Sequence, residues 1–151
     1  MPYEIEATAT CFAAPEVIFK HLCVAEAWGE WGGFWTRPRR ERAGREHPNG
    51  IGAIRYIPPW REEVVVYEPP RRYGYVALAG PSRGLRAEIT LVPQGSNTLI
   101  RWRGVFEGGL PGAGPLTRAV LRRRLNGYAR RVAWHSERCE PGCPARLPGI
   151  L

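Results

Sequence analysis

The sequence predicts an α+β fold in which a curved antiparallel sheet of about seven strands wraps around one long helix near the C-terminus. Several short alternating segments are separated by turn residues, and two short helical stretches follow the first of them. One long amphipathic segment comes last. Consecutive strands with hairpin-length links form antiparallel sheets, and the apolar stripe of a single long helix needs such a sheet to cover it.

The long helix is expected over Gly114–Glu137. Pro115 suits its first position, where a backbone N–H would have no partner within the helix. Apolar and small residues recur at spacings of four, four, three and four, which places them on one helical face. These residues are Thr117, Leu121, Leu125, Tyr128 and Val132.

The first strand is expected over Tyr3–Phe12, where apolar and polar residues alternate. The alternation leaves two facings open, with Glu6, Thr8 and Thr10 lining either the interior or the solvent face. Pro15 then begins a short helix.

A second helical turn lies within Ala27–Phe34. Its Trp28 is expected at the rim of the fold. The remaining strands are expected over Trp35–Glu41, Ile51–Ile57, Arg61–Tyr67, Arg72–Ala79, Gly84–Val92 and Thr98–Phe106. Their links carry turn residues, including Pro58-Pro59, Gly80-Pro81-Ser82 and the five residues Pro93–Asn97, and a Gly/Pro loop spans Glu107–Gly114.

The chain has 151 residues, which predicts one domain over residues 1–138 and a Pro/Gly-rich tail over residues 139–151. We expect that tail to be poorly ordered. No apolar run of about 18 residues is present, and the N-terminus lacks a basic-then-apolar stretch. These observations favour a cytoplasmic protein without a membrane span.

The formal net charge is +8, and Lys20 is the single lysine among 22 basic residues. Such a charge could attract an anionic partner, or it could reflect arginines spread over a solvated surface. No aromatic-interleaved RNA-binding pattern, zinc-finger spacing or P-loop accompanies the arginines. We therefore expect no specific nucleic-acid partner.

His135, Cys139 and Cys143 recur every four residues, a spacing that would align metal ligands on an uninterrupted helix. Pro141 and Gly142 interrupt that helix, so incidental thiols in a frayed tail are expected and a metal site is not. No G-x-S-x-G elbow or G-x-G-x-x-G loop occurs either, so hydrolase chemistry and a dinucleotide cofactor lack support. No cofactor is expected.

An ordered set of segments carries a family resemblance. They are Phe12–Phe19, the tryptophan turn ending at Trp31, Gly50–Arg55, Glu62–Val64, Glu68–Arg72, Tyr73 with Tyr75, and Thr98 with Ile100 and Trp102. Over residues 3–137 the chain resembles the START-like, Bet v 1-like superfamily (SRPBCC), in its bacterial polyketide cyclase/dehydrase and lipid-transport branch. The resemblance implies a helix-grip fold with a cavity between the sheet and the C-terminal helix.

The resemblance also suggests site residues. Arg55 and Glu62 flank the Pro58-Pro59 turn and could pair across adjacent strands, Arg55 holding an enolate and Glu62 moving a proton together with Tyr75. A structural salt bridge is the alternative. Ligand-contacting positions are expected at Trp31, Tyr73, Ile100, Trp102, Leu121, Leu125 and Tyr128. Plain core packing of these rings is the other interpretation.

Two functions remain open at this point. One is binding of a small hydrophobic ligand, ring-containing or polyketide- or lipid-like, in the cavity between sheet and helix. The other is a polyketide cyclase or aromatase that uses Arg55, Glu62 and a pocket tyrosine. The sequence does not decide between a monomer and a homodimer.

Overall fold

In the computed structural model, which describes residues 2–79, 83–107 and 112–151, seven strands form one antiparallel sheet. The strands are β1 (Pro2–Cys11), β2 (Arg39–Arg42), β3 (Ile54–Ile57), β4 (Trp60–Glu68), β5 (Arg72–Ala79), β6 (Arg86–Gln94) and β7 (Asn97–Glu107). The helices are α1 (Pro15–Cys23), η1 (Ala25–Ala27), α2 (Trp28–Trp31), α3 (Gly114–Ser136) and η2 (Pro144–Arg146). The predicted turn at residues 80–82 and most of the predicted loop before α3 lie outside the described residues.

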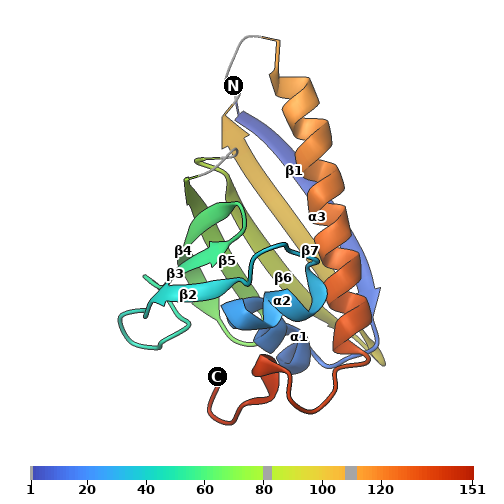
Figure 1. Ribbon diagram of the computed structural model, residues 1–151. Coiled ribbons are helices and arrows are strands. Elements are labelled where there is room, and N and C mark those ends of the chain that lie inside the picture. The colour runs from blue at the N-terminus through green and yellow to red at the C-terminus, as the bar shows by residue number, and fades with distance from the viewer. Residues whose placement is uncertain (1, 80–82, 108–111) are drawn as a thin grey trace.

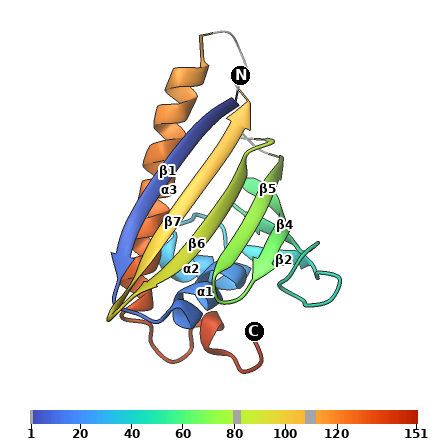
Figure 2. The same cartoon turned by 180° about the vertical axis from the view of Figure 1, so that it is seen from behind.

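The sheet order is β1-β7-β6-β5-β4-β3-β2, so β1 pairs with the last strand of the chain. The connection through α1, η1 and α2 carries the chain from β1 to the opposite edge, where β2 begins the meander (Figure 1). Seen from behind, the strands stand in front of α3, which lies along the other face (Figure 2). The predicted α+β helix-grip arrangement is confirmed.

The helix α3 packs mainly against β1 and also against β7. Of the predicted stripe, Leu121, Leu125, Tyr128 and Val132 are buried, whereas Thr117 is half-buried near the N-terminal end. The Cys11 thiol donates to the Ala133 carbonyl at 3.2 Å and so ties β1 to the last turns of α3. The 3.6-residue periodicity therefore identified the buried face of this helix correctly.

The facing of β1, which the sequence left open, is settled by burial. Ile5, Ala7 and Cys11 point into the core. Glu6, Thr8 and Thr10 are exposed, and Glu6 pairs with Arg101 of β7 at 3.1 Å. The polar face of β1 therefore lies outside the helix grip and contributes nothing to its interior.

Three strand boundaries differ from the expectation. The strand β2 begins only at Arg39, and β3 begins at Ile54 because the chain turns at Gly52, which has a φ of +90°. The link between β6 and β7 is shorter than expected, since Gln94 pairs with Asn97 across a two-residue turn. Gly95 supplies the positive φ of 64° that such a tight hairpin turn uses.

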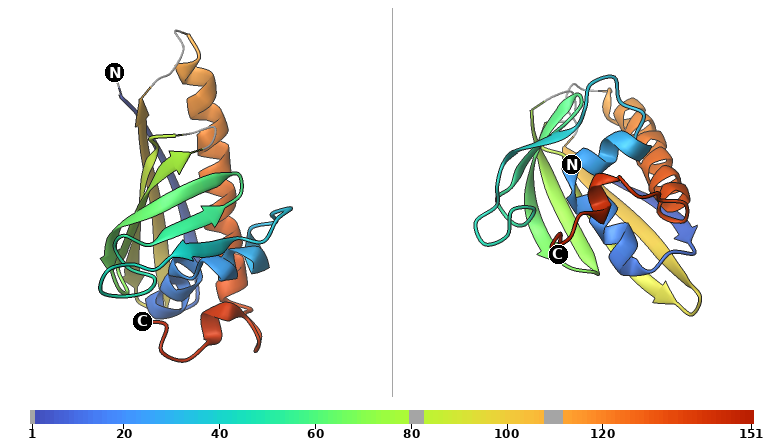
Figure 3. Two further views of the ribbon diagram at one scale, coloured as in Figure 1. Left: turned by 60° about the vertical axis from the view of Figure 1, so that its left-hand side comes forward. Right: turned by 60° about the horizontal axis from the view of Figure 1, so that its bottom comes forward.

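The C-terminal segment folds back beneath α1 and the end of α3 (Figure 3). Its turn η2 contacts α1 and η1, and the Glu137 carboxylate accepts a hydrogen bond from the Phe12 backbone N–H at 2.9 Å. Cys143 and Ala145 are buried. Residues 139–151 thus make tertiary contacts that their Pro/Gly content did not predict. Among the described residues, no helix is long and apolar enough to cross a membrane.

Candidate functional site

The predicted pairing of Arg55 with Glu62 is present at the bottom of the grip. The two residues stand opposite each other in the β3–β4 register, and Arg55 Nη2 lies 2.7 Å from Glu62 Oε1. Arg55 is 1% exposed and Glu62 is 4% exposed. A charge pair this deep is a polar anchor inside an apolar core, because each ion would be costly to bury without the other.

Arg55 is held from several sides. Its Nη1 donates to the Leu22 carbonyl at 2.6 Å, and its guanidinium carbon lies 5.0 Å from the ring centre of Trp28 and 5.1 Å from that of Tyr73. Aromatic faces stabilise a cation at this range. The last turn of α1 therefore positions Arg55 through a backbone carbonyl that the helix itself leaves unused.

Glu62 is the acid–base candidate of this pair. Burial raises the pKa of the Glu62 carboxyl above its usual value, and the charge and hydrogen bond of Arg55 oppose that rise. A raised carboxyl pKa is the direction of shift that favours an acid–base role. Burial also raises the pKa of the nearby Tyr75 hydroxyl well above 10.

Side chains fill the centre of the grip, so the cavity that the resemblance implied between the sheet and the helix does not lie there. The indole of Trp28 occupies that space, with its ring centre 4.5 Å from Trp31, 5.3 Å from Tyr128 and 5.8 Å from Trp102. Trp28 is fully buried and its Nε1 donates to the Leu22 carbonyl at 2.8 Å, so it is a core residue and not a rim residue. Tryptophan rings are large enough to fill a concavity of this size.

A void in the interior, bounded by described residues of β4, β5 and α3 among others, has a volume of about 10 Å³, which is too small for a ligand. We call it the inner void. It is lined by Trp60, Glu62, Tyr75, Ala77, Leu85, Leu121, Arg124, Leu125 and Tyr128.

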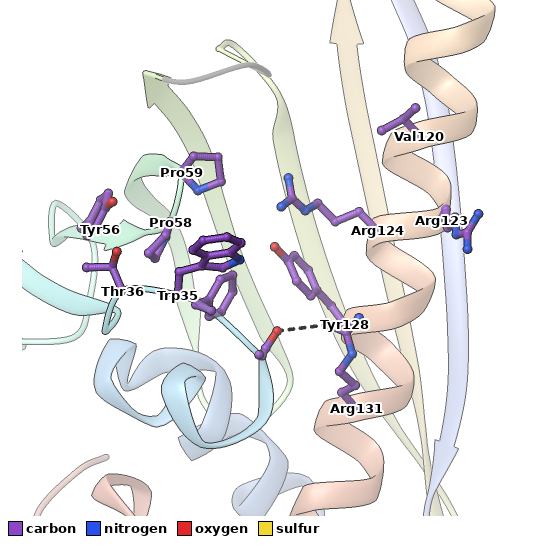
Figure 4. A pocket seen from close by; sticks show the side chains of 13 residues that line it. Trp35, Thr36, Tyr56, Pro58, Pro59, Val120, Arg123, Arg124, Tyr128 and Arg131 are labelled. Atoms are coloured by element: carbon purple, nitrogen blue, oxygen red, sulfur yellow. Dashed lines mark hydrogen bonds between the residues drawn. The ribbon is translucent and has the colours of Figure 1, made fainter.

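Open space lies instead beside the middle of α3, in a cavity of about 660 Å³ that we call the mouth pocket (Figure 4). Residues 32–36 and the β3–β4 turn form one side, and α3 forms the other. The lining residues are Gly32, Gly33, Phe34, Trp35, Thr36, Tyr56, Pro58, Pro59, Val120, Arg123, Arg124, Tyr128 and Arg131. The volume is within the range of pockets that hold small molecules.

Arg124 and Tyr128 line both the mouth pocket and the inner void, and we call these two side chains the partition. The Arg124 guanidinium carbon lies 3.6 Å from the ring centre of Trp60 and 5.9 Å from that of Tyr128. Burial raises the pKa of the Tyr128 hydroxyl to about 12, while Arg124 acts in the opposite direction. The partition separates the open space from Glu62.

The loop that faces α3 is fastened by Arg131, whose Nη1 donates to the Gly32 carbonyl at 3.2 Å (Figure 4). Trp35, three residues further on, is 104% exposed. A fully exposed tryptophan costs hydrophobic stabilisation and is more often seen where a surface takes part in binding.

The predicted ligand-contacting residues fall into two groups. Leu121, Leu125 and Tyr128 line the inner void, and Tyr128 also lines the mouth pocket. Trp31, Tyr73, Ile100 and Trp102 are buried in the core cluster and line neither space. A ligand-contacting role for these four residues stays a prediction, and their position matches the core-packing interpretation.

Several lining residues were not predicted from the sequence, chiefly Trp35, Tyr56, Arg124 and Arg131. The run of arginines over residues 122–131 was a visible signal for two of them. Arg124 and Arg131 lie seven positions apart and so share one side of α3. Arg123 and Arg130 have the same spacing, so periodicity alone does not identify the pair that lines the pocket.

Comparison with known proteins gives three similar solved structures. A START superfamily protein from Mycobacterium smegmatis is 16% identical with a TM-score of 0.76, covering 91% of this chain and 99% of that one. The Zhui aromatase/cyclase from a Streptomyces species is 15% identical with a TM-score of 0.72, covering 91% and 95%. The Aha1 dimer from Colwellia psychrerythraea is 15% identical with a TM-score of 0.61, covering 87% and 96%. At these identities the likeness shows a shared fold.

No curated protein matches the sequence significantly. The family described as polyketide cyclase / dehydrase and lipid transport matches residues 2–136, nearly the whole chain. Its extent coincides with the sheet and α3, from the first residue of β1 to the last residue of α3. The chain therefore belongs to the polyketide cyclase/dehydrase and lipid-transport family.

Proposed function

We propose that the protein binds a small, ring-containing amphipathic anion in the mouth pocket between the sheet and α3. The observation that supports this most strongly is the lining of the pocket, which combines aromatic rings with three arginines of α3. No Asp or Glu stands among the described lining residues. A polyketide-like or lipid-like acid offers the matching chemistry, with apolar rings or chains and a carboxylate or enolate.

The apolar part of the ligand would contact the loop side. Phe34, Trp35, Pro58 and Pro59 present flat, apolar surfaces there, and the exposed face of Trp35 would gain burial on binding. The charged end would meet Arg124 and Arg131, whose guanidinium groups can hold a carboxylate through two hydrogen bonds.

An anthraquinone carboxylic acid and its uncharged methyl ester are suitable probes, titrated against tryptophan fluorescence. Arg124→Gln should weaken binding of the acid by about 10–100-fold, the loss expected for one charge-assisted hydrogen bond. Binding of the ester should change little. Arg122→Gln is the matched control, because Arg122 is exposed on α3 and lies outside the pocket lining. Equal affinities of wild type for acid and ester would overturn the anionic part of the proposal.

A second candidate function is cyclisation of a poly-β-keto chain. Glu62 and Tyr75 both line the inner void, directly behind the partition. In this reaction the Glu62 carboxylate takes a proton from the carbon between two carbonyl groups, and the resulting enolate carbon attacks a distant ketone to form the ring bond. The new alkoxide then takes up a proton from Tyr75 or water, and that donor regains its proton from the protonated Glu62 carboxyl, so both groups return to their starting states.

In this candidate the role of Arg55 changes from that expected from the sequence. Its Nη1 and Nη2 are occupied by Leu22 and Glu62, so it would act as a positioning residue for the carboxylate. Substrate would reach Glu62 only after the Arg124 side chain moves.

Turnover of a poly-β-keto thioester tests this candidate. Glu62→Gln should abolish ring formation while leaving the affinity for the anthraquinone acid within about twofold, since Glu62 lies behind the partition. Retention of full turnover in Glu62→Gln would exclude Glu62 as the base. Absence of turnover in wild type, with acid binding intact, would leave binding as the function.

A further inference from the structure

Four potential metal ligands that are far apart in the sequence meet beneath the grip. His21 lies on α1, His135 lies in the last turn of α3, and Cys139 and Cys143 lie in the C-terminal segment. One ligand atom from each residue lies within 4.8 Å of all the others. The place where the segment passes under α1 and the end of α3 is visible in Figure 3.

Three nitrogen–sulfur separations in this cluster are close to those of a tetrahedral metal site. Nε2 of His21 lies 3.2 Å from Cys139 Sγ and 3.7 Å from Cys143 Sγ, and His135 Nε2 lies 3.8 Å from Cys143 Sγ. Tetrahedral zinc with Zn–S bonds of about 2.3 Å and Zn–N bonds of about 2.0–2.1 Å places nitrogen and sulfur about 3.6 Å apart. The four side chains thus already surround a centre of the right size.

The tautomer of His21 leaves the correct nitrogen free. Nδ1 lies 2.8 Å from the Val17 carbonyl oxygen, which can only accept, so Nδ1 carries the proton and donates it. The lone pair of Nε2 therefore points at the two sulfur atoms. An outer hydrogen bond from the second ring nitrogen to a carbonyl is the usual arrangement for a metal-bound histidine.

Arg146 provides an outer partner for one of the sulfurs. Its Nε donates to Cys139 Sγ at 3.3 Å, and its Nη2 donates to the Cys139 carbonyl. A guanidinium in this position would hold a metal-bound Cys139 sulfur in place as an outer hydrogen-bond partner. The Arg146 side chain therefore holds both the sulfur and the backbone carbonyl of Cys139.

The breaks in the helix create this geometry. The helix α3 ends at Ser136, the Arg138 N–H bonds to the His135 carbonyl, and Gly142 turns the chain with a φ of +97°. Cys139 and Cys143 are thereby brought back under His135. Pro141 and Gly142 do interrupt the helix, but the turn that they make brings the two cysteines to His135 and to the distant His21.

We propose that His21, His135, Cys139 and Cys143 bind one zinc ion. Two imidazoles and two thiolates are a donor set typical of zinc, and the two thiols release their protons to solvent on binding. Two thiolates balance the charge of Zn²⁺, so a neutral centre forms in this largely buried place. Four protein ligands leave no open position, which makes the site structural and not catalytic.

The zinc would clamp α1, α3 and the C-terminal segment together under the aromatic core. The backbone carbonyl of His21 accepts from Trp31 Nε1 at 3.3 Å, and the next carbonyl, that of Leu22, holds Trp28 and Arg55. Fixing the His21 side chain thus fixes the helix end on which these residues depend. This inference stands independently of the proposed ligand.

The first measurement is metal content. The full chain, purified under reducing conditions without chelator, should contain one zinc ion per chain when its metal content is measured by elemental mass spectrometry. Cys139→Ser and Cys143→Ser should lose it. Cys11→Ser and His47→Gln are matched controls that lie outside the cluster, and they should retain one zinc per chain.

The second measurement is cobalt substitution of the metal-free protein. Wild type should show the intense visible bands of tetrahedral Co²⁺ together with a thiolate-to-cobalt charge-transfer band in the near ultraviolet. Arg146→Met should weaken zinc binding by about 10-fold, as expected for an outer partner. Cys139→Ser should weaken it by more than about 100-fold, because it removes a direct ligand.

A Tm measurement on the wild type distinguishes loss of the metal site from misfolding of a variant. Chelation should lower the Tm of the wild type by about 10 °C, and re-added zinc should restore it. The same chelation should leave the Tm of Cys139→Ser unchanged. Reduced wild type that takes up neither zinc nor cobalt would overturn the proposal. So would zinc content that Cys139→Ser leaves intact, or that Cys11→Ser abolishes.

Discussion

Arg55 illustrates how one buried cation organises the base of the grip. It joins β3 to β4 through Glu62, joins the sheet to α1 through Leu22, and places its charge beside the rings of Trp28 and Tyr73. Its Nε has no hydrogen-bond partner among the described residues. The residue therefore combines a strong positional constraint with an incompletely satisfied polar group.

Removing one partner of this pair should be strongly destabilising. Arg55→Met is expected to lower the free energy of unfolding by about 3–5 kcal/mol, because the Glu62 carboxylate would be left buried without its cation. Glu62→Gln should also be destabilising, because it leaves the Arg55 guanidinium buried without its anion. In urea unfolding, the double variant should lose clearly less than the sum of the two single losses. Additive losses would show that the pair contributes no coupling energy.

The raised pKa of Tyr128 predicts that the protein loses stability at alkaline pH. Burial raises its pKa from 10 to about 12, so between these values the unfolded chain has lost the phenol proton while the folded chain retains it. Stability therefore falls as the pH rises from 10 to 12, by about 2–3 kcal/mol from this group. Unfolding of wild type and Tyr128→Phe across this range checks it. An identical pH slope in the two proteins would contradict the assignment.

At the scale of elements, α3 is the segment that the sequence described best. Its periodicity identified Leu121, Leu125, Tyr128 and Val132 as buried, because helical spacing and the need to cover apolar surface act locally. Strand ends were less predictable. The start of β3 depends on the turn at Gly52, and that of β2 depends on pairing with β3, which is information from outside each segment.

Two leucines of α3 provide a matched test of its orientation. Leu125 is 2% exposed and Leu116 is 70% exposed. Leu125→Ala should cost about 2–5 kcal/mol of unfolding free energy, since it leaves a cavity against the sheet, whereas Leu116→Ala should cost less than about 0.5 kcal/mol. Similar costs at the two positions would show that α3 presents a different face to the sheet.

At the scale of the whole molecule, the sequence predicted the fold but not the location of its open space. Whether rings fill a concavity or line it depends on the summed volumes of side chains from many elements, and Trp28, Trp31 and Trp102 together fill this one. The approach of His21 to Cys139 and Cys143 is likewise a product of the tertiary fold. Neither feature has a local sequence signature.

On the proposed function, the mouth pocket takes the ligand and the aromatic core does not. Two exposed tryptophans make the most direct test, because Trp35 lines that pocket and Trp134, 62% exposed, does not. In an NMR titration with the anthraquinone carboxylic acid, the indole N–H signal of Trp35 should shift saturably while that of Trp134 stays in place. Equal shifts of both signals, or a saturable shift confined to Trp134, would contradict the account.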